Sequence, residues 1–353
     1  MKRIVLTGGG TAGHVTPNIA LIDRLKEEGF EISYIGSKTG IEKTLIEEQG
    51  IPYYSISTGK LRRYFSLKNL TDPFRVLKGC REAKKLMKQL KPSVVFSKGG
   101  FVSVPVVRAS GKAKIPTVVH ESDMTPGLAN KLSLRYATNI CCNFAETLEH
   151  VKGKGIHTGT PIRKELFTGT REAGLAYAGF TDDRPVILVV GGSTGAVRVN
   201  EAVRKILPTL LTRFNVLHLC GKGKTDETVS YPGYVQKEYC DKEMKDVLAM
   251  ADVVVSRAGA NAICELLALH KPNLLIPLSA EASRGDQILN AASFEKQGFS
   301  MVMQEADITE TALADAICRL YENRQSYIDA MSASKSSDAT ETIVKLLCEL
   351  ANQ

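Results

Sequence analysis

The 353-residue sequence lacks any apolar run of about 18 residues, the length that a membrane-spanning helix requires. Its first residues lead directly into the apolar run Ile4–Leu6, so we expect no secretory signal peptide. The eight cysteines are scattered and include no Cys-x-x-Cys pair, which favours reduced thiols over disulfides or a zinc site. These absences predict a cytoplasmic protein without a transmembrane helix.

Several catalytic motifs are also absent. No Asp-x-Asp follows a predicted strand, so we expect no metal-bound diphosphate clamp, and no serine or cysteine nucleophile elbow occurs. The turn Gly8-x-Gly10-x-x-Gly13 has the dinucleotide-binding spacing, but Gly36-Ser37-Lys38 stands where an acidic residue would hold a ribose. Lys38 suits a 2′-phosphate, so an NADP-dependent oxidoreductase remains an alternative. The recurrence of glycine pairs at Gly99 and Gly191 argues against it, because one dinucleotide does not need three such turns.

Apolar strands alternate with helical segments along the chain, which predicts parallel sheets covered on both faces. The pattern pauses near Thr160–Arg163 and restarts with a second strand and glycine turn at Pro185–Ala196. We therefore predict an α/β protein of two Rossmann-like, doubly wound domains facing a central cleft, over 1–160 and 161–337. A helix over 338–353 is expected to pack back on the N-terminal domain. Further strands are expected at 31–36, 52–56, 94–96, 117–120, 140–143, 155–159, 216–221, 252–256 and 273–277.

The formal net charge of +8 is concentrated in one segment. Residues 60–91 contain eleven basic and two acidic residues, a local excess of +9, interleaved with large apolar side chains. This combination favours an amphipathic surface on anionic lipid. The alternative is a solvated helix whose apolar side belongs to the core. Nucleic acid is not an expected partner, because the sequence has no RNA-binding signature and no second basic stripe.

Polar residues follow the ends of several predicted strands. The first glycine turn predicts an anion cradle at a helix N-terminus, with His14 beside it as a base, an anion donor or a packing residue. The sequence His120-Glu121-Ser122-Asp123 is a candidate base cluster. Glu265 suits the two hydroxyls of a ribose, or is a first-turn glutamate favoured by the helix dipole. Asp286, Gln287 and Asn290 suit a sugar, or form an N-capping cluster.

Seven motifs, in order along nearly the whole chain, resemble the MurG family of glycosyltransferases, which is part of glycosyltransferase family 28. They are Gly8–Val15, Gly99–Ser103, His120–Asp123 with Gly127–Lys131, Gly159–Arg163, Gly191–Ala196, Arg257–Ala260, and Asp286–Gln287 with Asn290–Ala291. The resemblance implies a GT-B fold, UDP-GlcNAc as donor and lipid I as acceptor. It also implies inversion at the sugar, a peripheral location on the cytoplasmic face of the membrane, and no cofactor or metal.

The resemblance also implies roles for individual residues. His14 or Glu121 would be the general base, and the resemblance leaves the choice open. Gly10, Gly99, Gly100 and Ser103 would hold the acceptor diphosphate. The implied donor-binding residues are Thr11, Ala12, Gly13, Asp123, Arg163, Ser193, Cys240, Ala260, Glu265, Asp286 and Gln287. Among these, Cys240 would read uracil through its backbone, Glu265 would hold the ribose, and Ser193 with Arg163 would face the donor diphosphate.

The chain departs from the family pattern at several positions. Ala12 stands where the family often has glycine, and Phe101 replaces a frequent tyrosine. Ser122-Asp123 replaces a glutamine and an asparagine, of which the asparagine touches the sugar, and the kept Gln287 has Asp286 as its neighbour. An ionised Asp123 accepts hydrogen bonds but cannot donate them, so the sugar contact is expected to be rearranged. Other functions considered are a UDP-GlcNAc 2-epimerase and a non-catalytic, membrane-docked sensor of sugar nucleotides.

Overall fold

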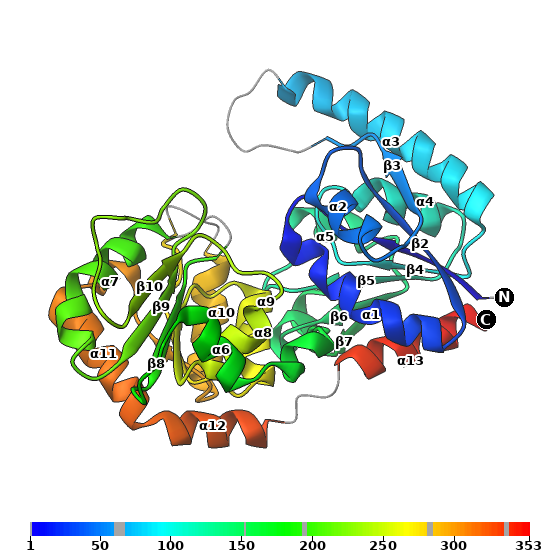
Figure 1. The fold of residues 1–353 in the computed structure, drawn as a ribbon. Coiled ribbons are helices and arrows are strands. Elements are labelled where there is room, and N and C mark those ends of the chain that lie inside the picture. Colours follow the sequence, from blue (N-terminus) through cyan, green and yellow to red (C-terminus); the bar gives the residue numbers. More distant parts are fainter. Residues whose placement is uncertain (1, 60–67, 152, 193–195, 281–284, 335–338) are drawn as a thin grey trace. The chain divides into compact units, whose positions relative to one another are not determined.

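The computed structural model describes residues 2–59, 68–151, 153–192, 196–280, 285–334 and 339–353 (Figure 1). Its contacts divide the chain into two compact units. Unit 1 comprises Met1–Arg163 with Ser336–Gln353, and unit 2 comprises Lys164–Lys335. The chain therefore passes from unit 1 to unit 2 and returns.

Unit 1 is built on a seven-stranded parallel sheet in the order β3-β2-β1-β4-β5-β6-β7. Its strands are β1 (Lys2–Thr7), β2 (Phe30–Ser37), β3 (Tyr53–Ile56), β4 (Val94–Ser97), β5 (Thr117–Glu121), β6 (Asn139–Cys142) and β7 (Gly155–His157). Thr7 lies opposite Ile35 on one side and Ser97 on the other, and Ser97 lies opposite Val119. The loops after β1, β2, β4 and β5 therefore leave the sheet at the same edge.

Helices cover both faces of this sheet, which explains its continuous apolar strands. Ile4 and Leu6 pack with α1 and α13 on one face, whereas Val5 packs with α3 and α4 on the other. The helices of unit 1 are α1 (Thr16–Glu27), α2 (Ile41–Glu47), α3 (Lys68–Leu90), α4 (Val104–Lys112), α5 (Leu128–Ser133) and α13 (Ala339–Ala351). Two 3₁₀ segments, η1 (Ala12–His14) and η2 (Ala145–His150), complete it.

Unit 2 has a six-stranded parallel sheet in the order β10-β9-β8-β11-β12-β13. The strands are β8 (Val186–Val190), β9 (Asn215–Leu219), β10 (Tyr234–Lys237), β11 (Val253–Ser256), β12 (Asn273–Leu275) and β13 (Met301–Val302). Its helices are α6 (Arg171–Ala178), α7 (Val197–Leu210), α8 (Met244–Met250), α9 (Ala260–Ala268), α10 (Asp286–Lys296), α11 (Glu310–Glu322) and α12 (Arg324–Ala333), with η3 (Lys164–Thr168) and η4 (Glu305–Asp307). The core joins α7 and α11 to one face of this sheet.

The predicted fold class of two Rossmann-like parallel sheets is confirmed, but two edge strands were not predicted. They are β10 and β13, which are four and two residues long. All eight cysteines are described and each is a free thiol, as predicted. None of the helices in the described ranges is long and apolar enough to cross a membrane.

Candidate active site

The edge of unit 1 where β1 and β4 end brings two glycine turns into contact. Gly100 has a φ of +81°, which favours glycine, and a Cβ added there would overlap the Gly9 carbonyl oxygen. The same Cβ would lie 3.0 Å from Cδ2 of His14. The turn after β4 is therefore packed directly against the turn after β1 and against the candidate base.

His14 ends the short 3₁₀ segment η1, just ahead of α1, and is half-buried. Its Nδ1 lies 3.2 Å from the carbonyl oxygen of Lys98. A carbonyl only accepts, so Nδ1 carries the proton and Nε2 is the basic nitrogen. This is the tautomer that a general base requires when a backbone group orients its ring.

Behind the first glycine turn lies a carboxylate that sequence reasoning did not single out. Glu42 of α2 is fully buried, and its Oε2 accepts the Gly10 N–H at 3.2 Å. Its Oε1 accepts the Ser37 N–H at 3.1 Å and also the Ser37 hydroxyl. The Gly10 N–H thus points at a carboxylate of the protein itself, which removes support from both a dinucleotide and an acceptor diphosphate at this amide.

Some polar groups of the second glycine turn form hydrogen bonds within the turn itself. The Gly99 N–H donates to the Ser97 hydroxyl at 3.2 Å, and the buried Ser103 hydroxyl donates to the Gly100 carbonyl at 2.9 Å. Ser103 thereby closes the turn directly before α4. These two donors are therefore not directed at a diphosphate. If this turn holds the acceptor diphosphate, as predicted for Gly99 and Ser103, the N–H groups at the N-terminus of α4 would bind it.

Lys98 connects the second turn to the end of β5. Its side chain is 1% exposed, and its Nζ lies 3.0 Å from Nδ1 of His120 and also donates to the Ser122 hydroxyl. Nε2 of His120 donates to the Gly159 carbonyl at 2.8 Å, so Nδ1 is the acceptor. Burial first, and the Lys98 charge second, hold the pKa of His120 well below its ordinary value. His120 is therefore a neutral, structural member of the predicted base cluster.

Glu121 closes the loop that follows β5. Its Oε1 accepts the Asp123 N–H at 3.1 Å, and its Oε2 accepts the Gly127 N–H at 3.0 Å and Nδ2 of Asn130 at 2.7 Å. Burial is the main reason why its pKa is raised. Because both oxygens are committed to protein donors, the geometry favours His14 over Glu121 as the base. Asp123 lies half-buried on the same loop.

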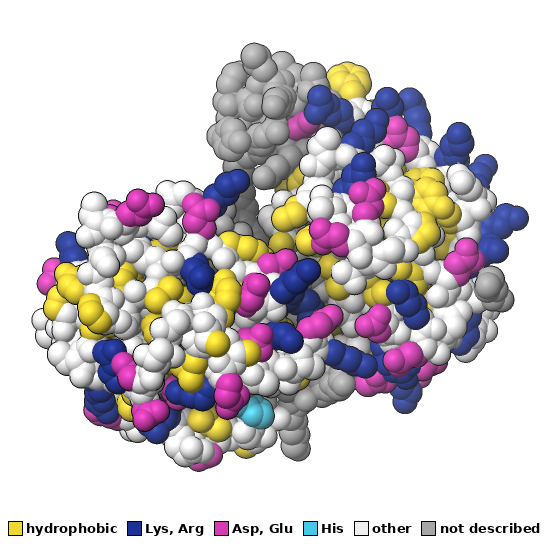
Figure 2. Space-filling model, viewed as in Figure 1, with side chains coloured by type: hydrophobic (Ala, Val, Ile, Leu, Met, Phe, Trp, Pro, Cys, Tyr) yellow, Lys and Arg dark blue, Asp and Glu magenta, His cyan; other side chains and the backbone are white. Residues whose placement is uncertain are grey.

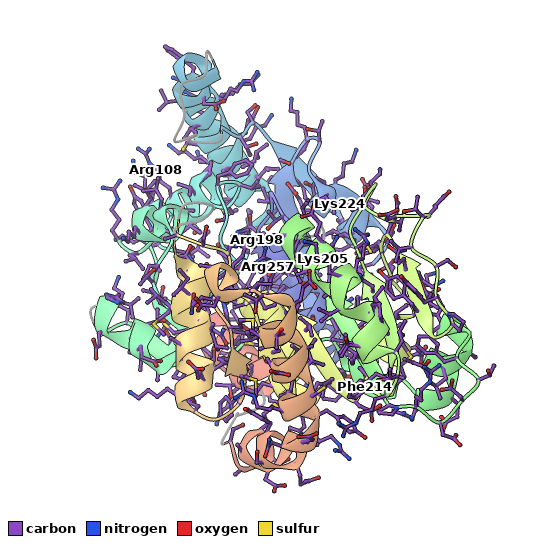
Figure 3. All side chains as sticks on the ribbon, turned by 90° about the vertical axis from the view of Figure 1, so that its left-hand side faces the viewer. Arg108, Arg198, Lys205, Phe214, Lys224 and Arg257 are labelled. Carbon is purple, nitrogen blue, oxygen red and sulfur yellow. The ribbon has the colours of Figure 1, made fainter. Side chains whose placement is uncertain are left out.

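In unit 2 the ends of β11 and β12 are joined by an arginine. Arg257, labelled in Figure 3, is 8% exposed; its Nη1 donates to the Ile276 carbonyl at 3.0 Å and its Nη2 pairs with Glu305 at 2.5 Å. The side chain therefore braces two strand ends. Helix α9 begins directly after this turn, at the buried Ala260, and carries a half-buried Glu265 in its second turn.

The other predicted donor-site residues of unit 2 lie on loops and on α10. Oε1 of Gln287 accepts the Leu278 N–H at 3.1 Å, whereas Asp286 is the first residue of α10 after Gly285, whose φ is +80°. Cys240 is buried, which raises the pKa of its thiol to about 11. Ser193 lies outside the described residues, and Arg163 is half-buried in unit 1.

Comparison with known proteins decides between the functions left open by the sequence. The model of the glycosyltransferase family 28 N-terminal domain matches residues 4–142, and that of the C-terminal domain matches residues 186–346. The chain belongs to glycosyltransferase family 28.

Relatives within family 28 match over nearly the whole chain. A protein of Lachnospira eligens named UDP-N-acetylglucosamine–N-acetylmuramyl-(pentapeptide) pyrophosphoryl-undecaprenol N-acetylglucosamine transferase is 64% identical over 98% of this chain and 99% of its own. A protein of the same name from Lachnoclostridium phytofermentans is 63% identical over 99% of each chain. The crystal structure of MurG from Acinetobacter baumannii has a TM-score of 0.76 at 27% identity and covers 99% of this chain and all of that one.

A solved putative UDP-N-acetylglucosamine 2-epimerase from Listeria monocytogenes has a TM-score of 0.74 at 13% identity, covering 99% of this chain and 96% of that one. At that identity the likeness shows a shared fold only. The family 28 match therefore carries the functional argument.

In unit 2 of this family 28 chain, strand β9 carries a buried histidine, His218, near its end. The Tyr234 hydroxyl donates to Nδ1 of His218 at 3.0 Å, and Nε2 donates to Oδ1 of Asn200 at 3.0 Å. Nδ2 of Asn200 donates in turn to the Cys220 carbonyl at 2.8 Å. Burial first, and Arg204 second, lower the pKa of His218 from 6.5 to about 3.

This shift predicts that unit 2 loses stability in mild acid. The unfolded chain binds a proton at His218 below pH 6.5 and the folded chain does not, so the stabilisation is full above 6.5 and declines as the pH falls toward about 3. Between pH 6.5 and about 5 we expect His218 to account for a loss of about 1–2 kcal/mol of unfolding free energy. Urea titrations of the wild type and of His218→Gln measure it. The exposed His270→Gln is the control and should keep the wild-type dependence; an equal dependence in His218→Gln would contradict the prediction.

Proposed function

We propose that this protein transfers GlcNAc from UDP-GlcNAc to the 4-hydroxyl of the muramyl residue of lipid I, with inversion at the sugar, and so produces lipid II for peptidoglycan. The observation that carries the proposal is the 64% identity to a transferase of that name over 98% of the chain. The product places the protein in cell-wall biogenesis, and through it in cell shape and division.

In this proposal, His14 of unit 1 takes the proton of the acceptor, and residues of unit 2 hold most of the donor. Nε2 of His14 takes the proton of the muramyl hydroxyl as its oxygen attacks C1 of GlcNAc, while the Lys98 carbonyl holds the ring. The ribose hydroxyls donate to Glu265, which α9 carries, and Ala260, Asp286 and Gln287 surround the sugar. UDP leaves as its diphosphate charge is met by Arg163 and the turn at Ser193.

The test is an incubation with labelled UDP-GlcNAc, with and without a lipid I analogue. We expect labelled disaccharide only when the acceptor is present. Label in a 2-epimer without acceptor would indicate the epimerase instead. Hydrolysis alone, or no reaction in either arm, would contradict the transferase.

We propose further that unit 1 binds the anionic cytoplasmic face of the membrane through α3 and α4. A cavity of about 640 Å³ between these helices is lined by Leu77, Cys80, Arg81, Lys84, Met87, Lys88, Arg108, Ala109, Lys112 and Ala113. Figure 2 shows Lys and Arg side chains gathered over α3, and Phe74 and Leu77 on α3 are 74% and 52% exposed. Apolar side chains beside cations suit the interface of an anionic bilayer. Part of the predicted segment, 60–67, lies outside the described residues.

Reversing two charges at this cavity should weaken membrane binding. For Lys84→Glu with Lys88→Glu we expect at least a 10-fold lower affinity for vesicles rich in phosphatidylglycerol, because each cation near such a surface contributes about 1 kcal/mol. The matched control reverses two exposed lysines of unit 2, Lys205→Glu with Lys296→Glu, and should bind as the wild type does. Co-sedimentation at low and high salt measures both. Equal losses in the two variants would indicate net charge rather than this surface.

A further inference from the structure

The first glycine turn has the build of an anion cradle, yet the anion in it belongs to the protein. Glu42 has no exposed surface, and its carboxylate accepts from Gly10, whose N–H would face a phosphate in a dinucleotide-binding turn. A Cβ added to Gly9 would overlap this carboxyl group, so the contact requires glycine there. We propose that Glu42 is a positioning residue: an internal carboxylate that fills the cradle of the first turn and fixes the backbone from which His14 projects.

The contacts of Glu42 join the turn to the neighbouring strand. Oε1 accepts the N–H and the hydroxyl of Ser37 at the end of β2, while Oε2 holds Gly10 in the loop after β1. The Tyr53 hydroxyl donates to the Ser37 carbonyl at 2.5 Å. Tyr53 therefore holds Ser37 in the position from which it donates to Glu42. A buried carboxylate that loses its donors is costly, so this arrangement resists distortion.

His14 lies between this carboxylate and the second turn. Gly10 is two residues ahead of η1, whose last residue is His14, and Gly100 packs against Gly9 and the His14 ring from the other side. The Tyr34 hydroxyl donates to the Gly8 carbonyl at 2.9 Å, and Nδ2 of Asn18 donates to the His14 carbonyl at 3.4 Å. Among these contacts, Glu42 supplies the carboxylate, and it holds Gly10 in the loop that leads to His14.

Two consequences follow for the reaction. The base is held by the protein before the acceptor arrives, because the turn's own amide is bonded without a ligand. The negative charge of Glu42 also disfavours a phosphate at Gly10, so the acceptor diphosphate is directed to the second turn and the N-terminus of α4. The inference rests on the proposed transferase function for its kinetic readout, but not for its second readout, the effect of formate on the melting temperature.

The experiment removes the carboxylate and then returns one from solution. Glu42→Ala should lower kcat by about 10- to 100-fold and leave KM for UDP-GlcNAc within about 2-fold, because a base displaced by about 1 Å loses this much rate. Formate should restore at least about 10-fold of the lost kcat in a saturable manner, whereas chloride at the same ionic strength should not. The matched control is Glu48→Ala, an exposed residue that follows α2, which should behave as the wild type.

A second variant covers the case in which Glu42→Ala does not fold. Glu42→Gln keeps the shape but turns an amide N–H₂ toward backbone donors, so kcat should fall about 10-fold without formate rescue, since no space is opened. Wild-type kcat in Glu42→Gln, or a folded Glu42→Ala that formate does not rescue, would overturn the proposal. If the wild type shows no transfer, the proposed function fails by itself. A formate-specific rise in the melting temperature of Glu42→Ala alone then still supports the internal carboxylate, and no rise overturns it.

Discussion

Replacement of His14 by alanine is expected to lower kcat by at least about 100-fold, the usual contribution of a positioned general base. The Lys98 carbonyl accepts from Nδ1 and leaves the basic lone pair on Nε2, so alanine removes the base without removing a buried charge. We expect KM for UDP-GlcNAc to stay within about 3-fold, since the residues predicted to hold the uracil and the ribose, Cys240 and Glu265, lie in unit 2. Steady-state kinetics with a lipid I analogue measure both constants.

The variant His14→Asn separates proton transfer from positioning. The Asn amide N–H₂ takes the place of Nδ1 and can donate to the Lys98 carbonyl, but it has no base in place of Nε2. We expect His14→Asn to be as slow as His14→Ala, and the acidic limb of the pH–rate profile to disappear in both. Near-normal turnover in His14→Asn would assign His14 a purely structural role.

Replacement of Glu121 by alanine is expected to be equally severe for activity, but for another reason. The change leaves the N–H groups of Asp123 and Gly127 and the amide of Asn130 without their acceptor. We expect a loss of about 3 kcal/mol or more of unfolding free energy, together with a loss of at least about 100-fold in kcat as the loop after β5 opens. Denaturant titration and kinetics on the same preparation measure the two effects.

The two residues are distinguished by the shape of the pH–rate profile. A variant of Glu121 that retains some turnover should keep the acidic limb of the wild type, because the proposed base, His14, is intact in it. Glu121→Gln provides the opposing case, since it keeps the size of the side chain. If Glu121→Gln is as stable as the wild type but has no measurable turnover, or has a residual turnover without an acidic limb, Glu121 is the base and His14 is not.

The parallel sheets could be predicted because their strands are buried on both faces. Residues 4–6 and 186–190 are continuous apolar runs, and glycine residues follow each of them within two positions. Edge strands carry a weaker signal, since one side has no neighbour: β10 contains Gln236 and Lys237, and β13 has only two residues. Their pairing depends on β9 and β12 being in place, which no local pattern records.

The sequence places the segments of the candidate site at strand ends, but it does not predict the contacts between them. Strand ends identify His14, Gly100 and His120 because a parallel sheet places its ligand-facing loops at one edge. The contacts of Glu42 and Lys98 were not predicted, because each is made with a residue far away in the sequence. Glu42 bonds to Gly10, 32 positions away, and Lys98 bonds to His14, 84 positions away. The order β2-β1-β4-β5 contains part of this information, because the first turn has the loops after β2 and β4 as its neighbours, and buried polar residues of those loops need hydrogen-bond partners nearby.

The return of the chain to unit 1 determines the order in which the two units can be completed during synthesis. The core on one face of the first sheet includes Ile343, Val344 and Leu347 of α13, packed with Ile4 and Leu6 of β1. Unit 2 closes once Lys335 has emerged from the ribosome, whereas that face of unit 1 is only partly covered, by α1, until α13 follows. A nascent chain stopped before α13 would expose the apolar side chains of this face that α13 covers and become a substrate for chaperones, even though everything around its predicted catalytic turn had already been made.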